Sequence, residues 1–193
     1  FLSKPWDILK IWEGGLASHG GTIGLLLAFY IYARKSKINY FWILSRVAVL
    51  IPLAGALIRV GNLMNSEIYG HTTTLPWGFL FVNSSDVLNG YEKLEPKHPT
   101  QLYEALAYLC IYGVLILYYF RTKIKENINN EFIIGFLLTG IFTFRFFIEY
   151  LKNNQVDFES NMALNMGQIL SLPFIAIGIT FLVLAKKGKK LKL

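Results

Sequence analysis

The chain has 193 residues, of which 54% are hydrophobic and only 16% are charged. Soluble domains typically carry about 25% charged residues, so this composition excludes an ordinary water-soluble fold. The apolar content excludes intrinsic disorder, and the single cysteine excludes a disulfide scaffold. The net charge of +7 fits either nucleic acid or a membrane surface, and the placement of the charges decides between these two partners.

Long apolar stretches dominate the chain. Crossing the hydrocarbon core of a bilayer takes about 20 mostly apolar helical residues. Four stretches meet or nearly meet this length and one is shorter; in chain order they are 20–33 (the short one), 40–58, 102–120, 132–150 and 166–185. We therefore expect an all-α polytopic membrane protein with about five transmembrane helices, forming a single integral membrane domain over residues 1–193.

Positive charges are divided unequally between the segments that join these stretches. Eleven Lys and Arg residues follow the first, third and fifth stretches, whereas three, Lys93, Lys97 and Lys152, follow the second and fourth. Cytoplasmic segments carry the excess of positive charge, so we expect a cytoplasmic C-terminus and a position for His19 near the outer face. The net charge is then a topology signal, and nucleic acid becomes a poor candidate partner.

One long segment, residues 71–98, joins the second and third stretches on the outer side. It contains two prolines, two glycines and the apolar run TLPWGFLFV, which is compatible with a short hairpin. We expect a small extracytoplasmic loop domain, or arm, inserted between the helices. Trp77 and Phe79 in this run are residue types that favour the membrane interface.

Polar side chains inside or at the rim of the apolar stretches are the candidates for function. A charged side chain at a helix centre costs about 2.5–3.5 kcal/mol on insertion scales, so such residues usually face a cavity or a partner. The set comprises Arg59, Asn62, Asn65, Glu67, Gln101, Glu104, Arg145 and Glu149, with His19 and His98 beside them. The expected topology places four of these residues in the outer half of the membrane, where the helices can direct them into one cavity; they are Arg59, Gln101, Arg145 and His19.

The spacing of these residues indicates how they share helix faces. Arg59 precedes Asn62 by three residues, and Arg145 precedes Glu149 by four, so each pair lies on one face. Two guanidinium groups at similar depth repel each other unless an anion lies between them, and arginine binds phosphate oxygens in a bidentate geometry. The pattern predicts an anionic ligand that carries phosphate, and a phospholipid is the obvious one at this depth.

Structural explanations for the same residues stay open. Arg145 and Glu149 can form an internal ion pair, Glu104 can be a structural hydrogen-bond acceptor, and His98 can be an interfacial loop residue. A metal site is not supported, because three scattered histidines and one cysteine show no ligand spacing.

Five motifs, in this order, resemble those of the prolipoprotein diacylglyceryl transferase family. They are HGGTIG (19–24), IRVGNLMNSEIYG (58–70), HPTQLYEAL (98–106), FRFFIEYLKNNQVDFE (144–159) and GQILSLPFIAIG (167–178). The resemblance implies a seven-span enzyme of the bacterial inner membrane that uses no metal or organic cofactor. Such an enzyme moves the diacylglyceryl group of phosphatidylglycerol onto the lipobox cysteine thiol of a prolipoprotein and releases glycerol phosphate.

The resemblance also implies the roles of individual residues. Arg59 and Arg145 correspond to two essential arginines, and His19 is the histidine of the H-G-G motif. The substrate-binding candidates are Gly20, Gly21, Asn62, Glu67, Gly70, His98, Gln101, Glu104 and Glu149. The family has two further helices before the His19 helix, so we expect this chain to be a fragment, which need not be active alone. Ile141 stands where the family commonly has tyrosine.

The implied reaction needs two chemical functions. A cysteine thiol, whose reference pKa is about 8.5, must lose its proton. Arginine stays protonated at working pH, so His19 is the best candidate base, and the two arginines would stabilise the leaving phosphate. A rival interpretation is a phospholipid or anion transporter, or a scramblase, that uses the same intramembrane arginines. Another head-group transferase, of the CDP-alcohol type, lacks support because the chain has no Asp-rich metal motif.

Overall fold

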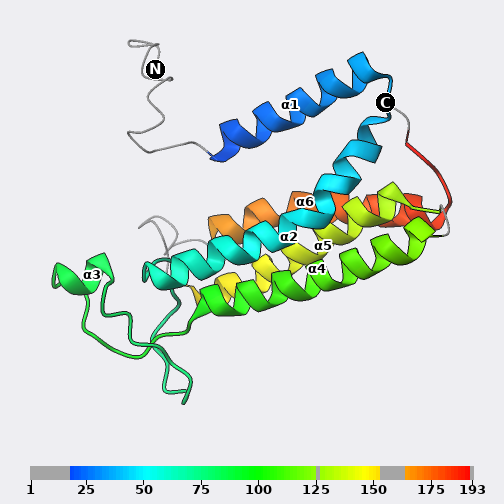
Figure 1. The fold of residues 1–193 in the computed structure, drawn as a ribbon. Helices are drawn as coiled ribbons and strands as arrows, with labels where there is room; N and C mark the ends of the chain where they lie inside the picture. The colour runs from blue at the N-terminus through cyan, green and yellow to red at the C-terminus, as the bar shows by residue number, and fades with distance from the viewer. Residues whose placement is uncertain (1–17, 125–126, 153–163, 192–193) are drawn as a thin grey trace, which may run out of the picture. The chain divides into compact units, whose positions relative to one another are not determined.

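The computed structural model describes residues 18–124, 127–152 and 164–191, with side chains from Gly20 onward. The chain divides into an N-terminal unit that ends at Ile43 and a main unit, Leu44–Leu191 (Figure 1). Its elements are α1 (Ser18–Ser36), α2 (Tyr40–Met64), α3 (Ser85–Leu88), α4 (Thr100–Ile124), α5 (Asn130–Ile148), the short 3-10 helix η3 (Glu149–Leu151) and α6 (Met166–Lys186). The all-α prediction is confirmed, since the described residues contain no strand, only isolated bridges.

Four of the described helices are long and apolar enough to cross a membrane. They are α2, α4, α5 continued by η3, and α6. They coincide with the predicted stretches 40–58, 102–120, 132–150 and 166–185, and α2 runs six residues further than predicted. The stretch 20–33 is helical within α1 but is not among the four. Its helix contains a polar first turn and ends in Arg34 and Lys35, which lowers its mean hydropathy. A spanning role for α1 stays a prediction.

The N-terminal unit is held together by aromatic contacts. α1 is followed by Lys37, whose φ of +56° lies in the left-handed region. The Asn39 side chain accepts a hydrogen bond from the Trp42 amide at the start of α2. The Tyr40 ring packs edge-on against Tyr30 at 6.0 Å between centroids. The described part of this unit therefore consists of α1, a tight turn and the first residues of α2.

Capping side chains fix where the later helices begin. Asn129 accepts from the Phe132 amide at 2.9 Å at the start of α5. Asn165 accepts from the Gln168 amide at 2.8 Å, and the Gln168 side chain accepts in return from the Asn165 amide at 3.1 Å. Such a reciprocal capping box satisfies two amides that the first helical turn leaves without partners. The same two side chains also donate to the Glu149 and Phe146 carbonyls, which places the start of α6 beside the end of α5.

Small residues bring the helices of the main unit into close contact. A Cβ added at Gly135 of α5 would lie 2.8 Å from the Leu182 amide of α6, and one at Gly178 would lie 2.7 Å from the Thr139 amide. Only glycine permits this backbone approach, which is a common way to pack helices in membranes. Between α2 and α4, Ala56, Ala105 and Tyr108 form a buried cluster. The four long helices thus make one bundle in the main unit.

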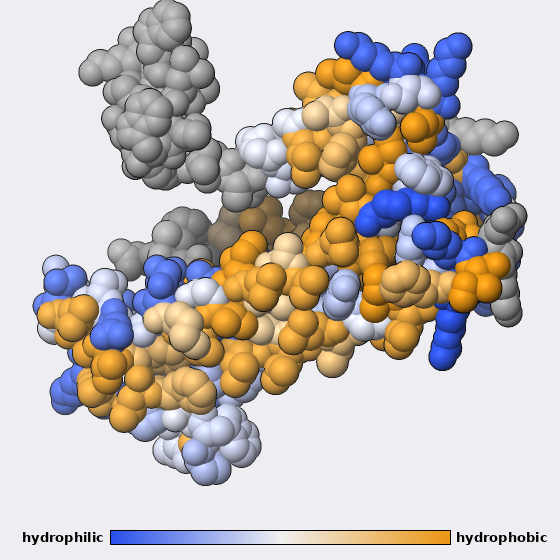
Figure 2. Space-filling model, viewed as in Figure 1, coloured by the Kyte–Doolittle hydropathy of each residue, from blue (hydrophilic) through white to orange (hydrophobic). Residues whose placement is uncertain are grey.

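The outward faces of this bundle are apolar. Only 17–33% of each candidate spanning window is buried, and Figure 2 shows the hydrophobic side chains covering the long helices of the main unit. Large exposed apolar residues include Leu57, Leu106, Phe147 and Leu170. A continuous apolar surface of this kind requires a hydrocarbon environment rather than water.

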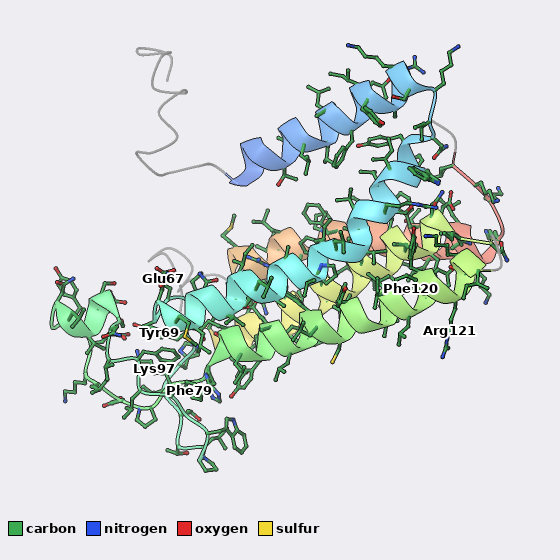
Figure 3. The ribbon with its side chains drawn as sticks, in the orientation of Figure 1. Glu67, Tyr69, Phe79, Lys97, Phe120 and Arg121 are labelled. Carbon is green, nitrogen blue, oxygen red and sulfur yellow. The ribbon has the colours of Figure 1, made fainter. Side chains whose placement is uncertain are left out.

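Residues 65–99 form an arm at one end of the bundle, with its own small core (Figure 3). Tyr69 stacks on Phe81 at 4.9 Å, and its hydroxyl contacts Ser84 Oγ at 2.7 Å. Lys97 pairs with Glu92 and lies 4.5 Å from the Tyr69 ring centroid. Burial raises the pKa of Tyr69 to about 12, and the hydrogen bond from Lys97 lowers the pKa of Glu92.

The arm does not contain the hairpin with which its apolar run was compatible. Within residues 65–99 it has the four-residue helix α3 and two isolated antiparallel bridges, which join Thr72 and Phe79 to Lys97. A hairpin needs a continuous ladder between adjacent strands, and here both partners converge on one residue. The Trp77 indole instead donates a hydrogen bond to the Tyr103 hydroxyl of α4 at 2.9 Å.

Candidate active site

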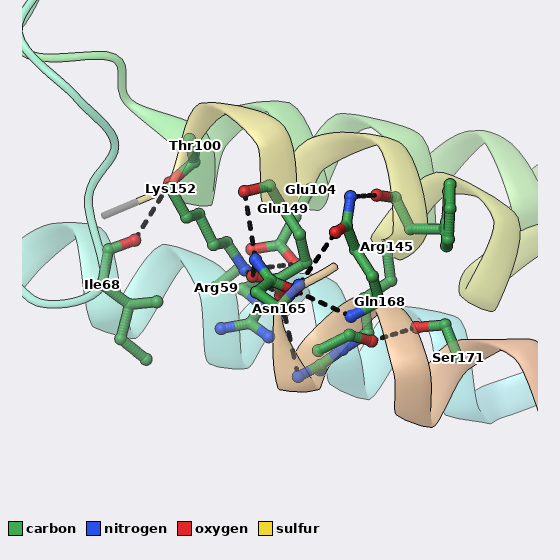
Figure 4. A network of polar contacts seen from close by, with 12 residues as sticks. Arg59, Ile68, Thr100, Glu104, Arg145, Glu149, Lys152, Asn165, Gln168 and Ser171 are labelled. Carbon is green, nitrogen blue, oxygen red and sulfur yellow. Dashed lines mark hydrogen bonds and ion pairs between the residues drawn. The ribbon is translucent and has the colours of Figure 1, made fainter. Parts of the chain in front are cut away.

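Five charged side chains from α2, α4, α5, η3 and the residue after η3 form one ionic network (Figure 4). Arg59 Nε lies 3.2 Å from Glu104 Oε2, and Lys152 Nζ lies 3.2 Å from Glu104 Oε1. Lys152 Nζ also lies 3.3 Å from Glu149 Oε1, which is 3.8 Å from Arg145 Nη2. Three cations and two carboxylates leave the network with one net positive charge.

The network lies at the arm end of the bundle, where Arg59 and Glu104 are inside their helices and Glu149 and Lys152 are at the end of α5 and η3. Arg59 is five residues before the last residue of α2, and Glu104 is four residues after the first residue of α4. At 1.5 Å per residue these positions are about 6–8 Å from the helix ends. Glu104 is fully buried and Glu149 is 6% exposed. Charges buried in this way must be paired, because an isolated one costs several kcal/mol.

Residues at the start of α6 also contact the network. The Asn165 side chain donates to the Glu149 backbone carbonyl at 3.4 Å and to Glu149 Oε2 at 3.5 Å. Gln168 donates to the Phe146 carbonyl at 3.3 Å. The residues that cap α6 therefore also orient the carboxylate of Glu149.

The R-V-G-N-L-M-N-S-E stretch, residues 59–67, covers the end of α2 and the turn that follows it. Arg59 Nη1 contacts Asn62 Oδ1 at 3.4 Å, as the three-residue spacing predicts, and Asn62 donates to Glu67 Oε2 at 3.2 Å. Two residues at the start of α4 bind the backbone of this turn. Gln101 donates to the Glu67 carbonyl at 2.5 Å, and Thr100 donates to the Ile68 carbonyl at 3.0 Å. Gln101 therefore holds the backbone of the turn, and the Glu67 side chain contacts Arg59 only indirectly, through Asn62.

Ile68 in this turn has a φ of +58°, in the left-handed region. A β-branched residue there is a genuine outlier that costs about 1–3 kcal/mol, and such strain persists only where the surroundings impose it. The hydrogen bond from Thr100 and the neighbouring one from Gln101 are the contacts that hold the turn in place.

Gly70 is required for close backbone contact. Its amide donates to the His98 carbonyl at 2.9 Å, and it pairs with Lys152 in an isolated bridge. A Cβ added there would lie 2.9 Å from both His98 Cβ and Thr100 Cγ2, and would also meet the Leu151 carbonyl. Gly70 therefore acts by joining the arm to the segment that carries Lys152.

His98 lies apart from the network in the described contacts. Its Nδ1 is 3.4 Å from the Tyr103 hydroxyl, which also accepts from Trp77. This environment fits the interfacial alternative that the sequence left open for His98. A direct role for His98 in substrate binding stays a prediction.

The candidates His19, Gly20 and Gly21 lie in α1, within the N-terminal unit. The His19 side chain lies outside the described residues, and Gly20 and Gly21 are exposed. Their predicted roles are therefore not tested by the geometry of the main unit.

Lys152 is the member of the network that the sequence analysis missed. It was counted as a loop charge on the outer side, but it is 4% exposed and pairs with two carboxylates. A hydropathy pattern predicts that a lysine following a membrane span is in contact with water. The side chain of Lys152 instead turns back into the bundle. The signal available in the sequence was the three-residue spacing from Glu149.

Arg59 and Arg145 are joined through the protein's own anions. Two guanidinium groups at similar depth need anions close to them, and Glu104 and Glu149 supply these anions. The Arg145–Glu149 ion pair that the sequence allowed is therefore present. The Arg145 side chain nevertheless stays 35% exposed, against 14% for Arg59.

Ile141 contributes to packing rather than to the polar network. It lies against the cluster of Ala56, Ala105 and Tyr108. The Tyr108 hydroxyl in that cluster is 3.5 Å from Glu104 Oε1. A tyrosine hydroxyl therefore reaches the network from α4.

A cavity of about 690 Å³ lies within the arm, between residues 65–69 and the segment around α3, and Lys152 lines it. Its other polar lining residues are Asn65, Ser66, Glu67, Tyr69, Asn83, Ser84, Ser85 and Asp86. This volume is in the range that holds a small ligand or a lipid head group. The cavity brings the arm and the ionic network to one place.

Fold and site together define a polytopic helical membrane protein with a buried cationic network at one end of its bundle. The comparison with known families specifies it further: the model of the family "Prolipoprotein diacylglyceryl transferase" matches residues 1–184. The chain belongs to the prolipoprotein diacylglyceryl transferase family.

Curated relatives agree with this assignment. The chain is 47% identical over 178 residues to the phosphatidylglycerol–prolipoprotein diacylglyceryl transferase of Bacteroides fragilis, covering 92% of this chain and 61% of the relative. It is 43% identical to the enzyme of that name from Porphyromonas gingivalis, covering 97% and 68%, and 44% identical to that of Tolumonas auensis, covering 98% and 69%. The chain thus spans roughly two thirds of the length of these relatives.

Proposed function

We propose that the protein of which this chain is part transfers the diacylglyceryl group of phosphatidylglycerol to the lipobox cysteine of a prolipoprotein. The observation that carries this proposal is the single network that joins Arg59 and Arg145 and bears one net positive charge. The names of the relatives state the same donor and acceptor classes. Nothing in those names supports the transporter or scramblase alternative.

The proposed reaction is an alkyl transfer. The cysteine thiol loses its proton to a base, and the thiolate sulfur bonds to the glycerol carbon that carries the phosphate ester. The bond between that carbon and the ester oxygen breaks, and its electron pair leaves with glycerol phosphate. The products are a thioether and a phosphate monoester, and the proton remains on the base.

Arg59 and Arg145 stabilise the charge that develops on the leaving phosphate. Fixed cations in a water-poor site are effective because they need no reorganisation during the reaction. Arg145 is the more exposed of the two, so it is the arginine better placed to contact the lipid phosphate. Arg59, held by Glu104 and Asn62, supplies a second fixed positive charge.

His19 is the proposed base, because neutral imidazole accepts a proton near physiological pH. The test is His19→Asn in the full gene product, assayed across pH. A base role predicts a large loss that raised pH partly restores, since the thiol then ionises without help. A small loss that does not depend on pH would reject this role.

We further propose the orientation of the bundle in the bacterial inner membrane. The basic residues after α4 and α6 lie in the cytoplasm, and the arm with the ionic network faces the outer leaflet. The support is the positive-inside rule together with the separation of the arm from Arg121 along α4 (Figure 3). Proteolysis of inverted and right-side-out vesicles, followed by mapping of the fragments, tests this orientation.

The decisive experiment supplies labelled phosphatidylglycerol and a lipobox peptide to the full gene product. Arg59→Ala and Arg145→Ala should each lower thioether formation by about 100-fold or more, as expected for removing a group that stabilises transition-state charge. Arg121→Ala, an exposed arginine at the other end of α4, is the matched control and should keep activity. Transfer at the wild-type rate in either of the first two variants would refute the phosphate role.

A further inference from the structure

Among the residues that the structure describes, Lys152 is the one charged group that contacts both carboxylates of the network. Its Nζ lies 3.2 Å from Glu104 Oε1 and 3.3 Å from Glu149 Oε1. Glu104 uses its other oxygen for Arg59, and Glu149 uses the same oxygen for Arg145. Each carboxylate therefore holds one arginine and Lys152 together.

The backbone at Lys152 is also fixed from the side of the arm. Gly70 forms an antiparallel bridge with Lys152, and the His71 amide donates to the Leu151 carbonyl at 2.9 Å. The Lys152 amide donates to the Glu149 carbonyl at 3.2 Å at the end of η3. The backbone at the lysine is thus anchored both to Gly70 and His71 of the arm and to the 3-10 helix that continues the helix of Arg145.

We propose that Lys152 is a positioning residue that fixes the spacing of Arg59 and Arg145. Without its charge, two carboxylates face two arginines, and the net charge of the network falls from +1 to zero. Each arginine is then held more tightly by its own carboxylate, and nothing ties the two pairs together. This inference rests on the proposed function, because the distance between the arginines matters only if both act on one phosphate.

The test uses Lys152→Met and Lys152→Arg in the full gene product, with phosphatidylglycerol vesicles and a lipobox peptide. Methionine keeps the volume without the charge, and we expect a fall in kcat of about 100-fold, the size expected when reacting groups are misplaced by about 1 Å. The KM for phosphatidylglycerol should change far less than kcat. Arginine keeps the charge and should restore most of the activity.

Lys97 provides the matched control. It is as buried as Lys152, at 4% exposure, and also pairs with a carboxylate, but it lies in the arm core beside Tyr69. Lys97→Met should lower thermal stability without changing kcat selectively. If Lys97→Met lowers kcat as much as Lys152→Met does, a general effect of losing a buried lysine explains the result and overturns the inference.

A double-mutant cycle separates positioning from simple structural support. Lys152 links the two arginines through Glu104 and Glu149, so the loss of Glu149 already breaks this link. Lys152→Met combined with Glu149→Gln should therefore lose no more activity than the worse single variant. If the losses in kcat of the two single variants multiply in the double variant, the proposal is overturned. A Lys152→Met enzyme with wild-type kcat would also overturn it. If Lys152→Met does not fold, Lys152→Gln replaces it, and an unchanged kcat in that variant contradicts the inference. Thioether formation by the wild-type protein tests the proposed function separately.

Discussion

Gly167, at the start of α6, lies directly against the carboxylate of Glu149. A Cβ added at Gly167 would be 2.6 Å from Glu149 Cδ and 2.7 Å from Glu149 Oε1. That oxygen is the one that contacts both Lys152 and Arg145. The absence of a side chain at Gly167 is therefore what lets α6 approach the network without moving its central carboxylate.

Gly167→Ala should displace the Glu149 carboxylate. We expect a loss of stability of about 1–3 kcal/mol, as for overpacking of a core, and a fall in kcat/KM of at least tenfold. Thermal unfolding in detergent and the transfer assay measure the two effects. Gly113→Ala is the control, since nothing described lies within 4 Å of a Cβ there and alanine favours the helix. An active, stable Gly167→Ala enzyme would contradict the proposed role of this close contact.

Replacing Ile68 tests the strain in the turn after α2. Its left-handed φ disfavours any side chain with a Cβ, so Ile68→Gly should be more stable than Ile68→Ala by about 1 kcal/mol. This order is the reverse of that expected in a helix, where alanine is favoured over glycine. Thermal unfolding of the two variants gives the sign. If Ile68→Ala is the more stable, the turn is not strained at this residue.

The arm should loosen at acidic pH. The hydrogen bond from Lys97 lowers the pKa of Glu92 below its usual 4.5, so the folded arm favours the ionised carboxylate. The stabilisation is complete above pH 4.5 and is lost as the pH falls through the lowered pKa, because the carboxyl group then takes up a proton. Emission from Trp77, in a variant whose other tryptophans are phenylalanine, should shift in this range. Glu92→Gln has no carboxylate to protonate, so the emission of Trp77 in this variant should not shift in this pH range.

Trp77 should lie at the membrane interface. Its indole is 53% exposed and is hydrogen-bonded to Tyr103, in the first turn of α4, at 2.9 Å. This contact fixes the ring at the depth where a spanning helix begins, which is the level that tryptophan prefers. In vesicles, lipids brominated near the head group should quench Trp77, and Tyr103→Phe should weaken the quenching. Efficient quenching by aqueous iodide instead would place the arm in water.

The sequence by itself determined the class of protein and which polar residues share a helix face. The four long apolar stretches became α2, α4, α5 and α6, because burying a helical backbone in hydrocarbon depends on local composition and length. The contacts predicted between Arg59 and Asn62 and between Arg145 and Glu149 are also present, because residues three or four apart share a helix face. The family motifs and the match to curated relatives agree for the same reason, because both are properties of local sequence.

Only the tertiary structure decided which charges meet. Lys152 follows a span and reads as a solvated loop residue, yet η3 and the bridge to Gly70 turn it back between Glu104 and Glu149. The arm formed isolated bridges around Lys97 instead of a hairpin, because contacts with Tyr69 and Glu92 hold it. Ion pairs between helices depend on rotation, depth and chain reversal, which are set by packing across residues distant in sequence and carry no local signal.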